Sequence, residues 1–313
     1  MLRYAATRLL GIVPTLFLVI TAAFFIVRLA PGGPFDQEQS LPPDIRANLE
    51  AAYGLDRPML VQYGRYVAGL LRGDFGPSFK YRDFTVTELI RRGLPVSLTI
   101  GFLALLLAVS GGIAAGCVAA LRRRPWVDPL VMGVAVIGMI VPVFVIAPVF
   151  QLLFGIGLGW LPVSGWKAGS VGDLVLPVVT LALPLMAYIA RLTRGSMLEV
   201  LASNFIRTAR AKGLPWRRVI LRHALPPALL PVVSYLGPAS AMVLTGSLVV
   251  EKLFGLPGSG RYLIEGALNR DYTLVLGMTV VVATLTLTLN LVADLIYAWL
   301  DPRVRFNASA PGP

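Results

Sequence analysis

Long apolar stretches recur along this chain, with shorter polar segments between them. Six intervals contain no Asp, Glu, Lys, Arg or His. About 20 apolar residues carry a helix across the hydrocarbon core of a bilayer, so the pattern predicts several membrane spans. The intervals cover residues 9–27, 93–121, 129–166, 174–190, 224–250 and 272–293.

The interval at 129–166 is too long for one span. After Phe154 it continues as GIGLGWLPVSGW, whose glycines, prolines and serines are typical of turns. The first interval exceeds the apolar core of a signal peptide, about 7–15 residues, so we expect a retained span there. A helical bundle follows, because every backbone polar group in lipid must be satisfied locally. The six predicted spans lie near 9–29, 95–121, 130–154, 174–194, 228–250 and 273–298.

Charge is distributed unequally between the two sides that six spans would define. The side that holds both termini carries 15 Lys/Arg and three acids, whereas the other side carries 12 of each. A Lys/Arg excess marks the cytoplasmic side, so we expect cytoplasmic termini. This asymmetry accounts for the net charge of +12, and nucleic-acid binding is not needed to explain it.

Composition supports a membrane protein and leaves little catalytic chemistry. The chain is 56% hydrophobic and 14% charged, against about 25% charged in a soluble domain. One Cys and one His argue against an internal disulfide and a His/Cys metal site. The sequence has no phosphate-binding G-x-x-x-x-G-K-[ST] loop and no serine nucleophile elbow. We therefore predict that the chain is not an enzyme and binds no cofactor.

The segment at 30–92 contains two helical patterns. Asp44 can cap a helix that runs to about Tyr53 and stops at Gly54. A second, amphipathic pattern runs from Met59 to Leu71 and ends at Gly73. The segment is either a connector that lies along the surface, or a lip around a pathway or dock for a partner.

Two polar residues stand out in the last span. Asn290 and Asp294 are four residues apart, so they share a helix face. An acid inside a membrane is a functional candidate, and these two residues form a possible intramembrane polar site. Near the interface, an acid more often serves as a structural partner for an arginine or a backbone amide.

The loop between the fourth and fifth predicted spans is strongly basic, with eight Lys/Arg in 191–223. Ser203 or Asn204 can cap a short helix, and Gly213 is well placed to end it. Pro215 suits the first position of a second helix that runs to Leu225. The sequence predicts a helix–turn–helix elbow at the membrane surface.

We expect an apolar ridge on this elbow, with basic side chains on either side. A positive anchor on anionic lipid would explain the charge, at about 1 kcal/mol per basic residue. It would not explain the ridge or the Gly–Leu–Pro break, whereas docking into a groove of a soluble partner explains both. The expected ridge consists of Phe205, Ile206, Ala209 and Leu214.

The same loop resembles a motif of ATP-binding-cassette (ABC) importers. Their membrane subunits carry a cytoplasmic loop of the form E-A-A-x-x-x-G-x9-I-x-L-P. Anchored on Gly213, the glycine, the third-position Ala209 and the final Leu225 and Pro226 match. The first Glu, the first Ala and the Ile of the motif are replaced here by Arg207, Thr208 and His223.

Seven segments, in order between residues 28 and 306, resemble more specifically the B-type permease of bacterial oligopeptide importers. The resemblance implies an all-α, six-transmembrane-helix type I ABC importer permease with a long periplasmic segment after the first helix. It also implies a location in the bacterial cytoplasmic membrane. The segments are RLAPGGPF, GDFGPSF, TRGSMLEVL, SNFIRTARAKGL, RVILRHAL, GLPGSGRYLIEGALNRDY and DPRVRF.

The resemblance implies partners as well. These are a second, similar permease subunit, two ABC ATPase subunits that bind ATP and Mg, and a periplasmic or lipid-anchored peptide-binding protein, with membrane lipid around the spans. The segments 30–92 and 251–271 would meet the binding protein. The implied ATPase-coupling loop contains Phe205, Ile206, Arg207, Thr208, Ala209, Lys212, Gly213 and Leu214.

The resemblance also divides the chain. Residues 1–93 would hold the first helix and the periplasmic segment, and 94–300 the transporter core with its coupling loop at about 195–227. A cytoplasmic tail would follow at 301–313. Oligopeptides are the expected cargo. Dipeptides, glutathione, nickel chelates or opines are alternatives within the same machinery, and a self-sufficient ion-coupled carrier is an alternative of another class.

Overall fold

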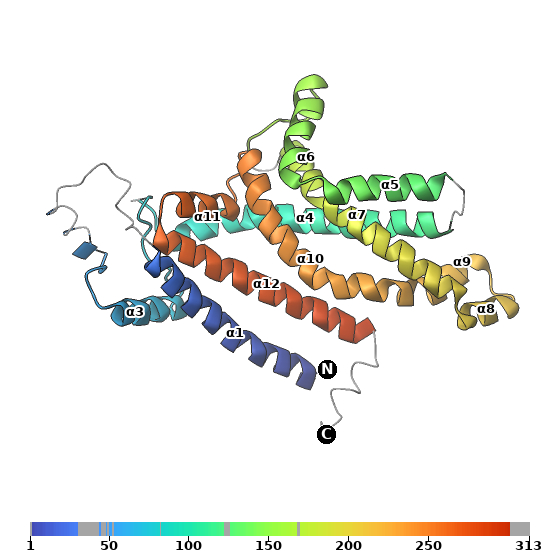
Figure 1. Cartoon of the computed structure of the whole chain (residues 1–313), viewed down its shortest axis with the longest axis horizontal. Coiled ribbons are helices and arrows are strands. Elements are labelled where there is room, and N and C mark those ends of the chain that lie inside the picture. Colours follow the sequence, from blue (N-terminus) through green and yellow to red (C-terminus); the bar gives the residue numbers. More distant parts are fainter. Residues whose placement is uncertain are drawn as a thin grey trace. The chain divides into compact units, whose positions relative to one another are not determined.

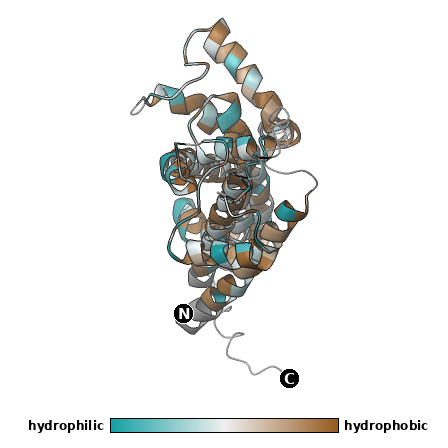
Figure 2. Ribbon diagram, turned by 90° about the vertical axis from the view of Figure 1, so that its left-hand side faces the viewer, coloured by the Kyte–Doolittle hydropathy of each residue, from teal (hydrophilic) through white to brown (hydrophobic). Residues whose placement is uncertain are grey.

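A computed structural model describes residues 2–30, 44, 48, 50–51, 53–81, 83–121, 126–167 and 170–300. These residues are predominantly helical, and hydrophobic residues predominate along the helices (Figure 2). Five helices are long and apolar enough to cross a membrane, and a bent pair makes six if it counts as one span. Large apolar side chains such as Leu10, Phe102 and Ile140 are more than 60% exposed, as expected for helices surrounded by lipid.

The helices appear in chain order in Figure 1. Their bounds are α1 Leu2–Leu29, α3 Met59–Leu71, α4 Val86–Leu121, α5 Val127–Ile140, α6 Val143–Phe150, the π-helix η1 Gln151–Gly157, α7 Gly172–Ala202, α8 Asn204–Ala211, α9 Trp216–Arg218, the π-helix η2 Val219–Ala224, α10 Leu225–Leu253, α11 Ser259–Leu268 and α12 Tyr272–Leu300.

The chain divides into two compact units. Unit 1 comprises residues 1–11, 98–256 and 286–313, and unit 2 comprises 12–97 and 257–285. In unit 1, α7 packs against α5, α6 and α10. Small residues allow α4 to approach α7 closely, because a Cβ added to Gly116 would lie 2.5 Å from the carbonyl oxygen of Ala190.

Unit 2 is organised around a buried carboxylate at the start of α12. Asp271 is fully buried, and its Oδ2 accepts hydrogen bonds from the Ser78 hydroxyl (2.5 Å) and from the backbone N–H groups of Phe79 (3.0 Å) and Lys80 (3.1 Å). Its Oδ1 accepts the N–H of Leu274 (3.1 Å), which caps the helix. One side chain therefore joins the segment before α4 to the first turn of α12.

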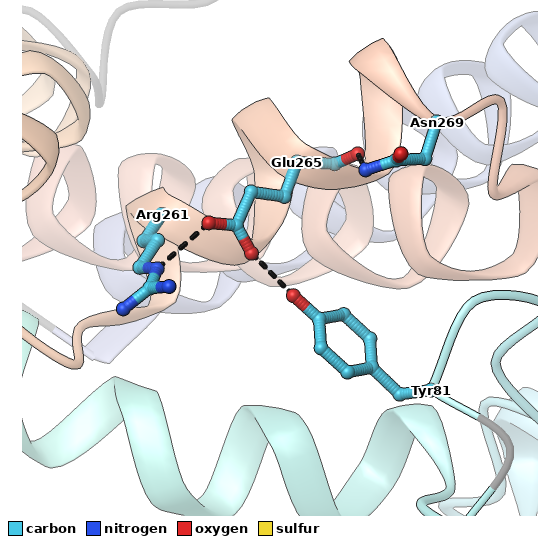
Figure 3. A network of polar contacts seen from close by, with 4 residues as sticks. All are labelled: Tyr81, Arg261, Glu265 and Asn269. Atoms are coloured by element: carbon cyan, nitrogen blue, oxygen red, sulfur yellow. Dashed lines mark hydrogen bonds and ion pairs between the residues drawn. The ribbon is translucent and has the colours of Figure 1, made fainter.

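A second polar network supports the same segment (Figure 3). The Tyr81 hydroxyl donates to the carboxylate of Glu265, whose other oxygen accepts the Nε–H of Arg261 at 2.7 Å. The side-chain amide of Asn269 donates to the Glu265 backbone carbonyl at 2.7 Å. Burial and the bond to Glu265 raise the pKa of Tyr81 above its ordinary value, so this hydroxyl keeps its proton at neutral pH.

The third predicted span differs from the structure. In place of one helix over 130–154, α5 ends at Ile140 and the α6–η1 segment follows with a bend of 106°. Val141 is extended (ψ 121°), because the ring of Pro142 disfavours helical conformation in the residue before it. The expected end at Phe154 is also wrong, because η1 continues to Gly157.

The fifth span is longer than predicted. The elbow's second helix does not stop at Leu225 but continues through η2 into α10, and the apolar span covers Trp216–Ala241. Pro226 and Pro227 have no N–H to donate to the carbonyls of Arg222 and His223. The backbone before them widens into the π-helix.

The connector after α1 is predicted well where the structure describes it. The amphipathic pattern from Met59 to Leu71 forms α3 with those bounds, and Gly73 follows it with φ +73°. Gly54 also has positive φ (+66°), as expected for a helix stop. The helix predicted to begin after Asp44 lies largely outside the described residues. The proposed division at 1–93, 94–300 and 301–313 stays a prediction.

Candidate functional site

The basic loop forms the predicted helix–turn–helix elbow. Figure 1 shows α8 as a short helix after the end of α7, with α9 above it in this view. Ser203 is the N-cap residue of α8, as expected, but its side chain does not cap the helix. Its hydroxyl instead donates to the carbonyl of Val200 at 2.5 Å. The sequence predicts Pro215 as the first residue of the second helix. In the structure Pro215 is the N-cap residue, and α9 begins one residue later at Trp216.

Gly213 ends α8 as predicted. It has φ +73°, and its N–H donates to the Arg210 carbonyl at 2.9 Å, while the N–H of Leu214 donates to the Ala209 carbonyl at 3.4 Å. These two bonds define a Schellman motif, which requires a left-handed residue at the glycine position. The turn therefore fixes the angle between α8 and α9.

The expected exposed ridge is wrong for two of its four residues. Ile206 is 1% exposed and Ala209 is 6% exposed, so neither is available to a partner. Both belong to a hydrophobic cluster against which Leu214 also packs. The other buried members of the cluster are Ala120, Met197, Val219, Ile220, Ala224 and Ala228.

The outward face of the elbow combines one apolar side chain with basic and polar ones. Phe205 is 48% exposed, and Arg207, Thr208 and Lys212 are exposed beside it. Trp216 is 49% exposed, and the Arg210 guanidinium lies 5.5 Å from its ring centroid, which is a cation–π contact. Of the eight predicted loop residues, a partner could contact those exposed on this face, such as Phe205 and Arg207. The buried residues Ile206 and Ala209 pack against the helices of this chain.

The two residues of the possible intramembrane polar site lie at a cavity in unit 1. Asn290 and Asp294 line the same cavity of about 390 Å³. Asp294 pairs with Arg8 at 3.3 Å, which agrees with the expected structural partnership with an arginine. A Cβ on Gly237 would lie 2.6 Å from the Asn290 Oδ1, so α10 and α12 approach closely here. The remaining lining residues are Val233, Ser234, Pro238, Ala293 and Tyr297.

Sequence reasoning missed the partners of two charges. It did not identify Arg8 as the partner of Asp294, nor the paired hydrogen bonds from the Arg194 guanidinium to Asp128. The partners are separated by 286 and 66 positions, and no local spacing connects them. Among the described residues, no group of three or more His, Cys, Asp or Glu comes together that could hold a metal ion.

Comparison with known proteins shows which family this chain resembles. The family described as "Binding-protein-dependent transport system inner membrane component" matches residues 112–306. The oligopeptide transport system permease protein OppB of Salmonella typhimurium is 53% identical over 98% of this chain and 100% of its own length. The dipeptide transport system permease protein DppB of Bacillus subtilis is 40% identical over 98% of this chain and 99% of its own length.

A solved structure shares the fold. An inward-facing conformation of the MetNI methionine ABC transporter matches with a TM-score of 0.55 and 17% identity, over 68% of this chain and 96% of that chain. The chain belongs to the family of inner membrane components of binding-protein-dependent transport systems.

Proposed function

We propose that this chain is a permease subunit of an ATP-driven importer and forms half of a membrane pathway for oligopeptides. The observation that carries the proposal is full-length similarity to oligopeptide permeases, at 53% identity for the Salmonella typhimurium protein. Dipeptide permeases are less similar, at 40% and 37% identity. Dipeptides are therefore the second candidate cargo.

The elbow is the proposed contact with an ATPase subunit. Phe205 and the exposed basic residues around it offer one apolar contact inside a positive rim, which suits a groove with acidic edges. Ile206 and Ala209 of α8 belong to one hydrophobic cluster with Met197 of α7 and Ala228 of α10. Because close-packed side chains transmit displacement, a push on α8 would move the cytoplasmic ends of α7 and α10 together.

The proposed assembly contains three other kinds of protein. A second, similar permease would complete the pathway, and two ABC ATPases would bind ATP and Mg below it. A periplasmic or lipid-anchored protein would deliver the peptide. This chain would lie in the cytoplasmic membrane with both termini in the cytoplasm. It would bind no cofactor and catalyse no reaction, so the partners would supply the energy.

Gentle purification of the tagged chain from its native membrane tests this proposal. We expect an ABC ATPase pair and a second permease to co-purify, and the complex in liposomes to take up an oligopeptide only with ATP inside and the binding protein outside. The chain purified alone is the control and should transport nothing. Uptake by the isolated chain driven by an ion gradient would contradict the proposal, as would purification without any ATPase.

The same liposomes distinguish the cargo. Peptides of two residues and of four or more residues can compete for uptake of one labelled oligopeptide. We expect the longer peptides to compete and dipeptides to have little effect. Preferential competition by dipeptides would assign the chain to the second candidate, with the ATP-driven machinery unchanged.

A further inference from the structure

The connector helix α3 exposes large apolar side chains along one side, and Gly64 and the half-buried Val67 lie between them. None of its residues is buried, and Leu60 and Leu71 are 74% and 85% exposed. Leu60, Gly64, Val67 and Leu71 are spaced i, i+4, i+7 and i+11, so they lie along one side of the helix. An exposed stripe of this kind needs an apolar environment or a partner.

A different side of α3 packs against α1. The rings of Tyr63 and Phe24 have centroids 5.3 Å apart, and Tyr66 stacks on Phe24 at 5.7 Å. Tyr63 also lies 5.6 Å from Phe25, and its hydroxyl forms a 2.6 Å hydrogen bond with that of Thr21. These contacts hold α3 beside the C-terminal part of α1 (Figure 1).

The contacts also give the depth of α3. The apolar span of α1 ends at Leu29, and Thr21 and Phe25 precede that end by about 12 Å and 6 Å at 1.5 Å per residue. Helices that lie in the membrane interface bury their apolar face about 5–10 Å into the boundary between headgroups and acyl chains. The ring contacts of Tyr63 and Tyr66 with Phe24 lie about 8 Å before the end of this apolar span, which agrees with an interfacial depth, where aromatic rings are enriched.

The charged residues in and next to α3 also fit an interfacial position. Helix α3 contains no acidic residue. Arg65 and Arg72 are seven positions apart, so they share a side of the helix, and both are exposed. On a helical projection the two arginines lie about 120° from the apolar stripe, on the side away from Tyr63. Arginines beside an apolar stripe match lipid phosphates above acyl chains.

We propose that α3 is an interfacial helix embedded in the leaflet at the C-terminal end of α1. Leu60 and Leu71 lie among the acyl chains, and Arg65 and Arg72 lie at the lipid phosphates. Tyr63 and Tyr66 hold the helix against α1. Such a helix fixes the middle of the connector to the membrane surface. The proposed placement does not depend on which cargo is transported.

Spin-label depth measurements test the proposal on the complete complex. The chain has one cysteine, so Cys117→Ser gives a background in which Leu60→Cys, Leu71→Cys and Asp74→Cys each carry one nitroxide. In vesicles of phosphatidylcholine with phosphatidylglycerol, we expect labels at 60 and 71 to be several-fold more accessible to oxygen than to a water-soluble nickel chelate. The label at 74 is the aqueous control and should show the reverse order.

Two results would overturn the proposal. In the first, labels at 60 and 71 are as accessible to the nickel chelate as the label at 74. In the second, they become protected only when the binding protein is added, which would assign the stripe to a protein contact. Peptide uptake by each labelled complex verifies that the variants are folded, and two stripe positions guard against failure of one.

Discussion

Gly213 has φ +73°, and no neighbouring atom lies within 4 Å of the position that its Cβ would occupy. A substitution there meets open space, so its cost comes from the backbone and not from a clash. A left-handed conformation costs an ordinary residue about 1–2 kcal/mol, and a β-branched residue tolerates it least. This position therefore allows the turn after α8 to be tested separately from packing.

We expect Gly213→Val to distort the turn and to reduce peptide uptake per ATP hydrolysed, while membrane insertion stays normal. The physical reason is that α8 would no longer be held at a fixed angle to α9. ATP hydrolysis and uptake are measured on the same reconstituted complex. Gly213→Asn is the matched control, because asparagine accepts positive φ, and it should keep most of the coupling. Unchanged coupling in Gly213→Val would contradict the assignment of this loop.

At the scale of elements, close contact between α4 and α7 depends on glycine. A Cβ on Gly116 would lie 2.5 Å from the Ala190 carbonyl oxygen and 2.7 Å from the Thr193 Cβ. Because these neighbours belong to α7 and include backbone, they cannot move without separating the helices. Overpacking of this kind costs about 1–3 kcal/mol or more.

We expect Gly116→Val to lower the thermal stability of the detergent-purified complex and to reduce its yield. Gly133→Val is the control, because Gly133 lies inside α5 with no atom within 4 Å of its added Cβ. Both variants carry the same change in helix propensity, a small gain from Gly to Val, so the difference in their unfolding temperatures measures the contact. Equal unfolding temperatures in the two variants would show that the approach of α4 to α7 does not depend on glycine at position 116.

The positions of the membrane-spanning helices and the glycine stops after α3 and α8 could be predicted from the sequence, because apolar runs and glycines are local signals. The break at Pro142 could not. Pro95, Pro177 and Pro184 all lie inside continuous helices, so proline alone does not tell which span will bend. The prediction that the apolar ridge of the elbow faces a partner was wrong for a similar reason. An amphipathic pattern identifies an apolar face, and only tertiary packing decides that Ile206 faces its own bundle.

At the scale of the whole molecule, the bent pair decides the topology. If α5 with α6 and η1 crosses the membrane, the chain crosses it four times between the segment before α4 and the start of α12: in α4, in the bent pair, in α7 and in α10. An even number of crossings places that segment and the start of α12 on the same side of the membrane. If the pair re-enters on the same side, three crossings place them on opposite sides. Ser78 and Asp271 form a 2.5 Å hydrogen bond, which requires one side. The contact therefore supports six spans.

Six spans also agree with the charge distribution and predict where each loop lies. We expect Lys212→Cys, in the Cys117→Ser background, to resist a membrane-impermeant maleimide in right-side-out vesicles until they are permeabilised. Lys80→Cys should react at once, because the segment before α4 lies one span from the N-terminus. The reason is the Lys/Arg excess on the side that holds the basic loop. Immediate labelling at 212 would place the elbow outside, beyond the reach of any ATPase, and would overturn both the orientation and the proposed coupling.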